Sequence, residues 1–375
     1  MAIGTWSGGR FMHFGEELEE ERLEALLRPG HGIHTVLTAD VYGEGEADRL
    51  LGRALSGVDR DSYRLVGAIG HDFHLGERQG AKGFPRFTDP ALRGPGSYGD
   101  YLRRAAERSL ESIGVSRFDL LLLHNPDRIG YESDEVWKAM AGLREAGLTG
   151  AIGVAPGPAN GFTLDLIGCL ERFGALIDWA MVILNPLEPW PGELVLGAAA
   201  DNDVRVITRV VDYGGLFWGD LGPGTPIGEA DHRRFRPQGW IEAGLERIAR
   251  IEQVRAETGL TLMQLACQWN LAHPAVECVV PTLIQEAGPG ARPVEDKRRE
   301  LAGLPPDLRL RRDQIAAIAA IGDNRGSMRL KGASPEHESA DAPDRWGLSE
   351  ELISAGERFG VEPQRDLRAT ALAAA

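Results

Sequence analysis

The chain has 375 residues, which is enough for one large domain or two of ordinary size. Hydrophobic residues make up 43% of it and charged residues 26%, a globular composition. The net charge of −15 disfavours nucleic acid and anionic membrane surfaces as partners, so we expect a small-molecule substrate. The composition does not indicate an oligomeric state.

The sequence also bears on the cellular compartment. No apolar run approaches the ~20 residues that a membrane-spanning helix requires, and the first residues lack the features of a signal peptide. Cys169, Cys267 and Cys278 are scattered among apolar residues without metal-ligand spacing. We therefore expect reduced core thiols, a cytoplasmic protein and no metal.

Short apolar runs alternate with longer amphipathic segments. The apolar runs lack polar alternation, which is typical of strands buried on both faces of a parallel sheet, and they are Ala2–Thr5, Ile33–Ala39, Arg64–Gly70, Asp119–His124, Gly150–Ala155, Trp179–Asn185, Val204–Val211 and Glu277–Pro281. Segments with helical spacing include Glu46–Leu55, Tyr98–Ile113, Asp134–Ala146, Gly161–Phe173 and Leu260–Ala272. This order predicts an α/β fold, a (β/α)₈ TIM barrel. No G-x-G-x-x-G follows an early strand, which disfavours a dinucleotide-binding open sheet.

Two regions depart from the alternating pattern. Residues 222–239 are rich in Gly, Pro and Arg and predict a long loop after strand seven, of the kind that forms a lid or binding loop. Residues 323–375 contain a helical stretch at Ser349–Phe359. We expect a barrel over residues 1–322 and a C-terminal extension over 323–375 packed on one barrel end.

Two motifs point to a family. Residues 37–43 read Leu-Thr-Ala-Asp-Val-Tyr-Gly and residues 121–127 read Leu-Leu-Leu-His-Asn-Pro-Asp. They resemble the Asp-Thr-Ala-x-x-Tyr-Gly and Leu-x-x-His-x-x-Asp segments of the aldo-keto reductase superfamily, and the resemblance runs from about Ile3 to Ile321. Residues 215–219 are similar to the family's Gly-x-x-x-Gly turn near the cofactor pyrophosphate, and residues 289–292 are similar to its Pro-Gly-x-Arg segment. They imply the cofactor-binding residues for the case that NADP is used: Gly215, Leu216, Gly219 and Arg292.

The resemblance implies a catalytic set that this chain keeps only in part. In the family a Tyr donates a proton to the carbonyl oxygen as hydride arrives from NADPH, a Lys–Asp pair lowers the pKa of that Tyr, and a His orients the carbonyl. Tyr42 and His124 stand at the Tyr and His positions, whereas Leu37 and Ala68 stand at the Asp and Lys positions. The tetrad is therefore degenerate, and Tyr42 lacks the inherited cation that would favour its ionised form.

The nicotinamide positions differ as well. Ala155-Pro156 replaces the family's Ser-Asn, Met181 replaces its Gln, and Arg209 replaces its aromatic platform. Pro has no backbone N–H, and Met and Ala cannot form amide hydrogen bonds. The sequence thus favours no cofactor, with NADP as the alternative. Arg209 suits a carboxylate or phosphate, unless Asp212 pairs with it.

Residues just beyond strand ends in a barrel converge on one mouth. Tyr42, His124, His71 and His74 are the predicted catalytic residues, with His71 or His74 moving a proton and a histidine setting a pH midpoint near ~6–7. A metal site built on these histidines is the less favoured interpretation, and Lys82 is a candidate substitute cation or a solvated loop lysine. The predicted substrate-binding residues are Asp40, Asp72, Asn125, Asn185, Trp190, Arg209, Asp212 and Tyr213.

These observations favour an enzyme with a rebuilt mouth. The expected chemistry is non-redox acid/base catalysis of the lyase or isomerase type, such as elimination, isomerisation or hydration, on a small polyol-like or carbonyl substrate. The alternative is a divergent NADP-dependent aldo-keto reductase acting on an aldehyde, ketone or sugar. A third class is a catalytically inactive barrel that serves as a regulatory subunit.

Overall fold

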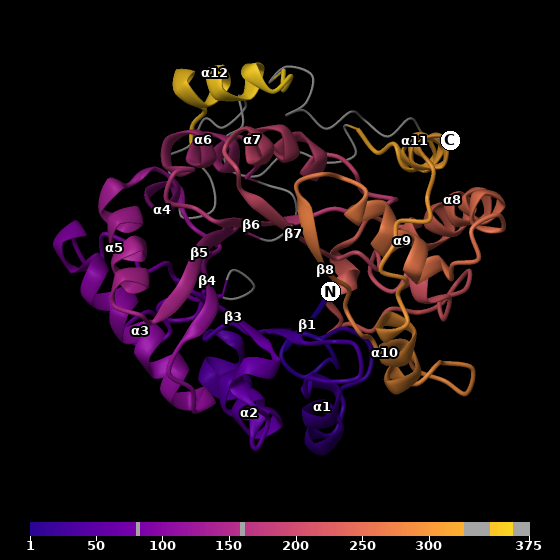
Figure 1. Cartoon of the computed structure of the whole chain (residues 1–375), viewed down its shortest axis with the longest axis horizontal. Coiled ribbons are helices and arrows are strands. Elements are labelled where there is room, and N and C mark those ends of the chain that lie inside the picture. The colour runs from indigo at the N-terminus through magenta and orange to yellow at the C-terminus, as the bar shows by residue number, and fades with distance from the viewer. Residues whose placement is uncertain (80–82, 158–161, 326–345, 363–375) are drawn as a thin grey trace.

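A computed structural model of the chain describes residues 1–79, 83–157, 162–325 and 346–362. Its eight strands are β1 (Ala2–Gly4), β2 (Thr35–Leu37), β3 (Arg64–Ile69), β4 (Phe118–His124), β5 (Thr149–Ala155), β6 (Trp179–Ile183), β7 (Arg205–Arg209) and β8 (Val276–Val280). Each strand pairs in parallel with the next in chain order, and β1 also contacts β8. The sheet is a nearly closed barrel surrounded by helices (Figure 1). The predicted fold class is confirmed.

The helices are α1 (Glu20–Leu27), α2 (Glu46–Leu55), α3 (Tyr98–Ile113), α4 (Arg128–Glu132), α5 (Asp134–Glu145), α6 (Thr163–Phe173), α7 (Val195–Asp201), α8 (Trp240–Arg255), α9 (Leu262–Leu271), α10 (Val294–Ala302), α11 (Arg312–Gly322) and α12 (Glu350–Arg358). The five helical segments read from spacing coincide with α2, α3, α5, α6 and α9 to within two residues at each end. Gly161, the expected start of the fourth segment, lies outside the described residues. None of the described helices is long and apolar enough to cross a membrane.

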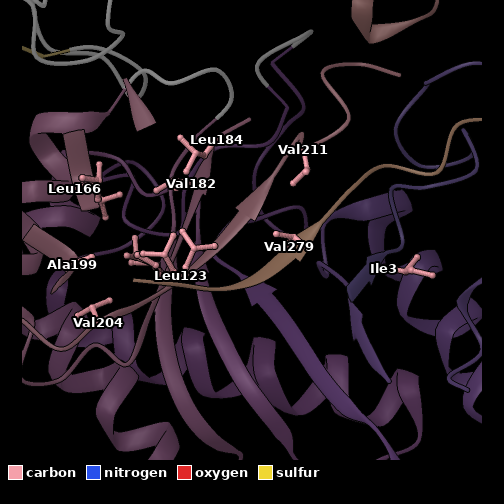
Figure 2. Close-up of a cluster of buried hydrophobic side chains, with 14 of the residues drawn as sticks. Ile3, Leu123, Leu166, Val182, Leu184, Ala199, Val204, Val211 and Val279 are labelled. Carbon is pink, nitrogen blue, oxygen red and sulfur yellow. The ribbon is translucent and has the colours of Figure 1, made fainter. Parts of the chain in front are cut away.

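Strand alternation produces two apolar layers. Leu123, Val182 and Val279 point outward from the strands and pack in one cluster with Leu166 of α6 and Ala199 of α7 (Figure 2). Because successive strand side chains face opposite sides, their neighbours point into the barrel. The inner cluster consists of Ala2, Leu37, Ala39, Val66, Ala68, Leu120, Leu122, Ala155, Met181, Ile207 and Val280. Leu37 and Ala68, which stand where the family resemblance implies Asp and Lys, therefore belong to the barrel interior.

The irregular regions pack closely on the barrel. Residues 222–239 contain a short turn, His232–Phe235, and bury the side chain of Arg233. In the described part of the C-terminal extension, Trp346 is buried and its indole Nε1 donates to Asp165 Oδ1 at 2.7 Å. Arg358 of α12 pairs with Glu171 of α6, with Nε to Oε1 at 2.7 Å. Helix α12 thus lies against α6 (Figure 1).

Candidate functional site

A cavity of about 90 Å³ opens at the carboxyl end of the strands. Its wall is mostly apolar, and among the described residues that line it only Tyr42, His124 and Arg209 have titratable side chains. The remaining lining residues are Trp6, Met12, Phe14, Leu37, Thr38, Ala39, Val66, Ala68, Leu122, Ala155, Met181, Val210 and Thr282. Three residues predicted from separate strand ends are therefore brought together. Trp6, Met12 and Phe14 were not predicted, because the loop between β1 and α1 has no periodic pattern that marks a lining side.

Tyr42 begins the turn that follows β2. Its backbone N–H donates to Ala39 O at 3.0 Å, which fixes the turn. The ring meets His124 edge-on with centroids 5.8 Å apart, and it meets Trp6 at 6.5 Å. Burial raises the pKa of the Tyr42 hydroxyl, and the charge of Arg209 opposes that rise. Tyr42 is accordingly a neutral phenol that keeps its proton at neutral pH.

His124 ends β4 and is 7% exposed. Burial, followed by the charges of Arg209 and Arg86, lowers the pKa of His124 to about 3. Its Nδ1 is buried and has no hydrogen-bond partner among the described residues. The imidazole is neutral at physiological pH and serves as a hydrogen-bonding group. The pH midpoint near ~6–7 expected from a histidine is not what this environment supports.

Arg209 ends β7, and its side chain crosses to the loop after β5. Its Nη2 donates to Pro156 O at 2.9 Å and to Gly157 O at 3.1 Å. No described carboxylate forms an ion pair with it, and its Nε is buried without a partner in the described chain. Burial lowers the pKa of the guanidinium, although arginine remains charged in proteins. The structure thus places an uncompensated cation in the cavity wall.

Asp212 is not the partner of Arg209. Its carboxylate accepts backbone N–H groups from Gly215 and Thr282, both at 2.8 Å. Burial raises the pKa of Asp212, and these two hydrogen bonds lower it again. The alternative interpretation, an Asp212–Arg209 pair, is therefore wrong, and Asp212 holds together the loops that follow β7 and β8.

Three further predicted substrate-binding residues do not line the cavity. Asn185 Oδ1 accepts the N–H groups of Leu187 and Glu188 at 2.9 Å each. Trp190 is fully buried, and its ring belongs to the outer apolar cluster. Tyr213 packs beneath the guanidinium of Arg236, 4.3 Å from its ring centroid. These side chains stabilise the loops around the mouth.

His71 lies directly behind His124, with ring centroids 5.1 Å apart. Its Nδ1 lies 3.1 Å from both Phe84 O and Arg86 Nη1, and its Nε2 lies 3.1 Å from Asn125 Nδ2. Burial, followed by the charges of Arg86 and His124, lowers the pKa of His71 well below its usual value. With both nitrogens engaged, His71 and Asn125 support His124 and do not line the cavity. Arg86, which sequence reasoning did not single out, adds a charge behind the site.

The remaining predicted residues lie farther from the cavity. His74 is exposed, and its ring packs on Phe73 at 4.2 Å. Asp72 is buried, pairs with Arg93 and accepts the N–H of His74 at 3.0 Å. Asp40 is buried with Oδ1 unpartnered in the described chain, and burial, then the charge of Asp48, raises its pKa well above the usual value.

A metal interpretation has no support in these positions. His74 is exposed and lies outside the cavity wall that holds His124. Across residues 1–79, 83–157, 162–325 and 346–362, no group of three or more His, Cys, Asp or Glu side chains is arranged to hold a metal ion. Lys82 lies outside the described residues.

The residues at the nicotinamide positions do not fit that ring in the pose that the family resemblance implies. Arg209 stands at the platform position, and its guanidinium reaches the carbonyl oxygens of Pro156 and Gly157. The side chain therefore crosses the space between the platform and the segment expected to bind the carboxamide. Ala155 and Met181 present only apolar groups to the cavity.

The turn at the expected pyrophosphate position packs against a buried ion pair. Gly215 begins the turn Leu216–Trp218 with φ +98°, and Gly219 ends it with φ +80°. A Cβ atom added at Gly215 would lie 3.0 Å from Glu286 Oε1 and 3.3 Å from Arg233 Nη1. The buried Arg233–Glu286 ion pair, with Nη2 to Oε2 at 3.0 Å, thus lies beside the start of the turn.

Arg292, the expected phosphate ligand, is already engaged. Its Nη2 pairs with Glu300 Oε2 at 2.6 Å, and its Nη1 approaches Trp218 O at 3.4 Å. Its backbone N–H donates to Asp220 Oδ1 at 3.3 Å.

The aldo/keto reductase family matches residues 1–287, and the chain belongs to that family. It is 23% identical over 294 residues to a 6-dehydroglucose reductase of Agrobacterium fabrum, covering 76% of this chain and 83% of that relative. It is 22% identical over 307 residues to a probable voltage-gated potassium channel subunit beta of Arabidopsis thaliana, covering 76% and 85%. Among solved structures, the glycerol dehydrogenase of Gluconobacter oxydans has a TM-score of 0.64 at 22% identity, covering 85% and 90%. An aldo-keto reductase of Klebsiella pneumoniae in complex with NADP and acetate has a TM-score of 0.58 at 20% identity, covering 92% and 94%.

These names bear on the expected chemistry. The reductase and the dehydrogenase are oxidoreductases, and none of the four proteins is named as a lyase or isomerase. The comparisons therefore give no support to the expected non-redox reaction. They favour the alternative, a divergent oxidoreductase, over it.

Proposed function

We propose that the protein is an oxidoreductase that acts on the carbonyl group of a small compound held between Tyr42, His124 and Arg209. The observation that carries the proposal is the makeup of the cavity wall, whose three titratable groups include no carboxylate. A neutral phenol, a neutral imidazole and a guanidinium all present hydrogen-bond donors. Such a set stabilises the negative charge that develops on a carbonyl oxygen when a nucleophile adds to the carbon.

Elimination and isomerisation require a base that removes a proton from carbon. The cavity wall offers only His124 for this task, and a pKa of about 3 makes it a weak base. His71 has both ring nitrogens engaged, and His74 is exposed outside the cavity. The geometry therefore supports addition to a carbonyl better than proton abstraction.

Reduction of a carbonyl delivers a hydride to carbon and a proton to oxygen. In our proposal Tyr42 supplies the proton, since burial keeps its hydroxyl protonated. His124 orients the carbonyl, and the positive charge of Arg209 stabilises the phenolate that Tyr42 leaves behind. The hydride would come from a nicotinamide cofactor such as NADPH, bound weakly in another pose, since Arg209 crosses the implied nicotinamide position.

The cavity also limits the substrate. Its volume of about 90 Å³ is smaller than the ~150 Å³ cavity that binds a benzene molecule. The apolar wall formed by Leu37, Ala68 and Met181 accommodates a short aliphatic part. We infer a compact carbonyl compound of three or four carbons.

Product analysis tests the proposal. The purified full chain is incubated with NADPH and a panel of small aldehydes, ketones, sugars and oxo acids, and products are identified by mass spectrometry. We expect the wild type to form a product that has gained two hydrogens. The Tyr42→Phe variant should not form this product. The control variant Tyr63→Phe should form it, because Tyr63 lies just before the amino end of β3 and does not line the cavity. Products of unchanged mass, or products that differ by one water, would show instead that the chemistry is isomerisation, elimination or hydration.

A further inference from the structure

The guanidinium of Arg209 has unused hydrogen-bonding capacity. Of its three nitrogens only Nη2 has partners in the described chain, and both of these are neutral carbonyl oxygens, Pro156 O and Gly157 O. Nε is buried and unpartnered. Arg209 is half-buried, and a cation withdrawn from water without a counterion is costly, so such groups are usually paired with an anion.

Tyr42 and His124 lie within electrostatic reach of this cation. The charge of Arg209 lowers the pKa of both side chains, and all three line one cavity. In the part of the chain that the structure describes, no carboxylate lines that cavity to compensate the charge. The missing anion would therefore come from a bound molecule.

We propose that Arg209 is the specificity-determining residue and that the substrate is a small 2-oxo acid, or the corresponding 2-hydroxy acid, bound through its carboxylate. This inference rests on the proposed function and names the substrate class of the same site. The Nη1 group of Arg209 has no partner in the described chain and can donate to a carboxylate, and a hydrogen bond between two charged groups is stronger than one between neutral groups. In a 2-oxo acid the carbonyl is adjacent to the carboxylate, so one small molecule can reach Arg209 with its carboxylate and Tyr42 and His124 with its carbonyl oxygen.

The cavity composition agrees with this substrate class. A volume of about 90 Å³ suits an acid of three or four carbons, and Leu37, Ala68 and Met181 give its methyl or ethyl end an apolar wall. If Arg209 had a purely structural role, it would only connect β7 to the loop after β5 through its hydrogen bonds. The structural role and the substrate-binding role make different predictions. A structural contact affects the stability of the protein, whereas a substrate-binding arginine also decides between charged and neutral ligands.

Isothermal titration of the full chain with sodium pyruvate and with neutral hydroxyacetone separates these roles. We expect Arg209→Gln to weaken pyruvate binding by about 10- to 100-fold, the loss of one charge-assisted contact, and Arg209→Lys to weaken it less. Hydroxyacetone binding should change little in either variant. The matched control is Arg205→Gln on the same strand, since Arg205 is exposed and stacks on Trp179 at 4.4 Å; this control should bind pyruvate like the wild type.

Unchanged pyruvate affinity in a folded Arg209→Gln variant would overturn the inference. If that variant does not fold, the melting temperature of the wild type decides, because a ligand that binds only the native state raises it. Pyruvate should raise it and hydroxyacetone should not; an equal rise with both would also overturn the inference. Reduction of neutral carbonyls without oxo-acid binding would refute the substrate class alone, whereas oxo-acid binding without any reduced product would refute the proposed function alone.

Discussion

The protonation state of His124 is the most directly testable consequence of the site's electrostatics. A pKa of about 3 means that roughly one imidazole in a thousand is protonated at pH 6, whereas an ordinary histidine with a pKa near ~6.5 would be about three-quarters protonated. Titration of ring-¹⁵N-labelled protein from pH 8 to pH 5, followed by NMR, measures this. Comparison with His124→Gln assigns the signal.

We expect no midpoint for His124 across that range. Its lowered pKa also means that the unfolded chain takes up the proton first, so the stability from this group is present above pH ~6.5 and is lost as the pH falls towards 3. Arg209→Gln removes a nearby positive charge and should raise the pKa of His124. A midpoint between pH 6 and 7 in the wild type would refute the reasoning, because burial and the two arginines would then not keep the imidazole neutral.

Three further outcomes follow from the same geometry. Tyr42→Phe should lower turnover by ~10²–10⁴-fold without moving any pH midpoint, as for loss of a general acid, and a small loss of rate would exclude that role. Asp48, whose pKa burial raises to about 6, binds its proton more readily in the native state, so its contribution to the free energy of unfolding should fall by about 2 kcal/mol from pH 4 to pH 6. Urea unfolding of wild type and Asp48→Asn should show that difference, and parallel curves would contradict it. Glu286→Gln leaves Arg233 without one buried partner and should cost about 3–5 kcal/mol in urea unfolding, whereas a cost below 1 kcal/mol would mean that water enters the pair.

The barrel was predictable because its strands are buried on both faces. That burial selects uninterrupted Val, Ile and Leu runs, and the runs at 64–70 and 119–124 match β3 and β4 to within one residue. The run at 204–211 is longer than β7, which ends at Arg209 because Val210 adopts φ +57°. Such a turn is decided by the packing of the following loop, and composition does not reveal it.

The candidate site was predictable only in part. Tyr42, His124 and Arg209 stand at strand ends and face the interior, as the family motifs and strand order indicate. Asn185 and Asp212 also follow strand ends, yet their side chains bind loop N–H groups. Once the chain leaves a strand, the period of two no longer fixes side-chain direction.

The pKa shifts in the candidate site could not be predicted from the sequence, because they depend on the tertiary structure. Arg86 lies far from His124 in sequence, and its effect on the pKa of His71 and His124 arises only after folding. The sequence alone led us to expect Ala68 and Leu37 where the resemblance implies Lys and Asp. The sequence did not reveal that the Arg209 side chain reaches across to the loop after β5, because its hydrogen-bond partners there, Pro156 O and Gly157 O, are backbone atoms.

The central claim is that Tyr42, His124 and Arg209 supply the oxygen side of a carbonyl reduction, while Arg209 crosses the implied nicotinamide position. Titration of the full chain with NADPH, followed by quenching of tryptophan fluorescence, tests this most directly. Because Ala155 and Met181 present only apolar groups where the resemblance implies carboxamide contacts, we predict a dissociation constant above ~100 μM. Sub-micromolar binding would contradict the account.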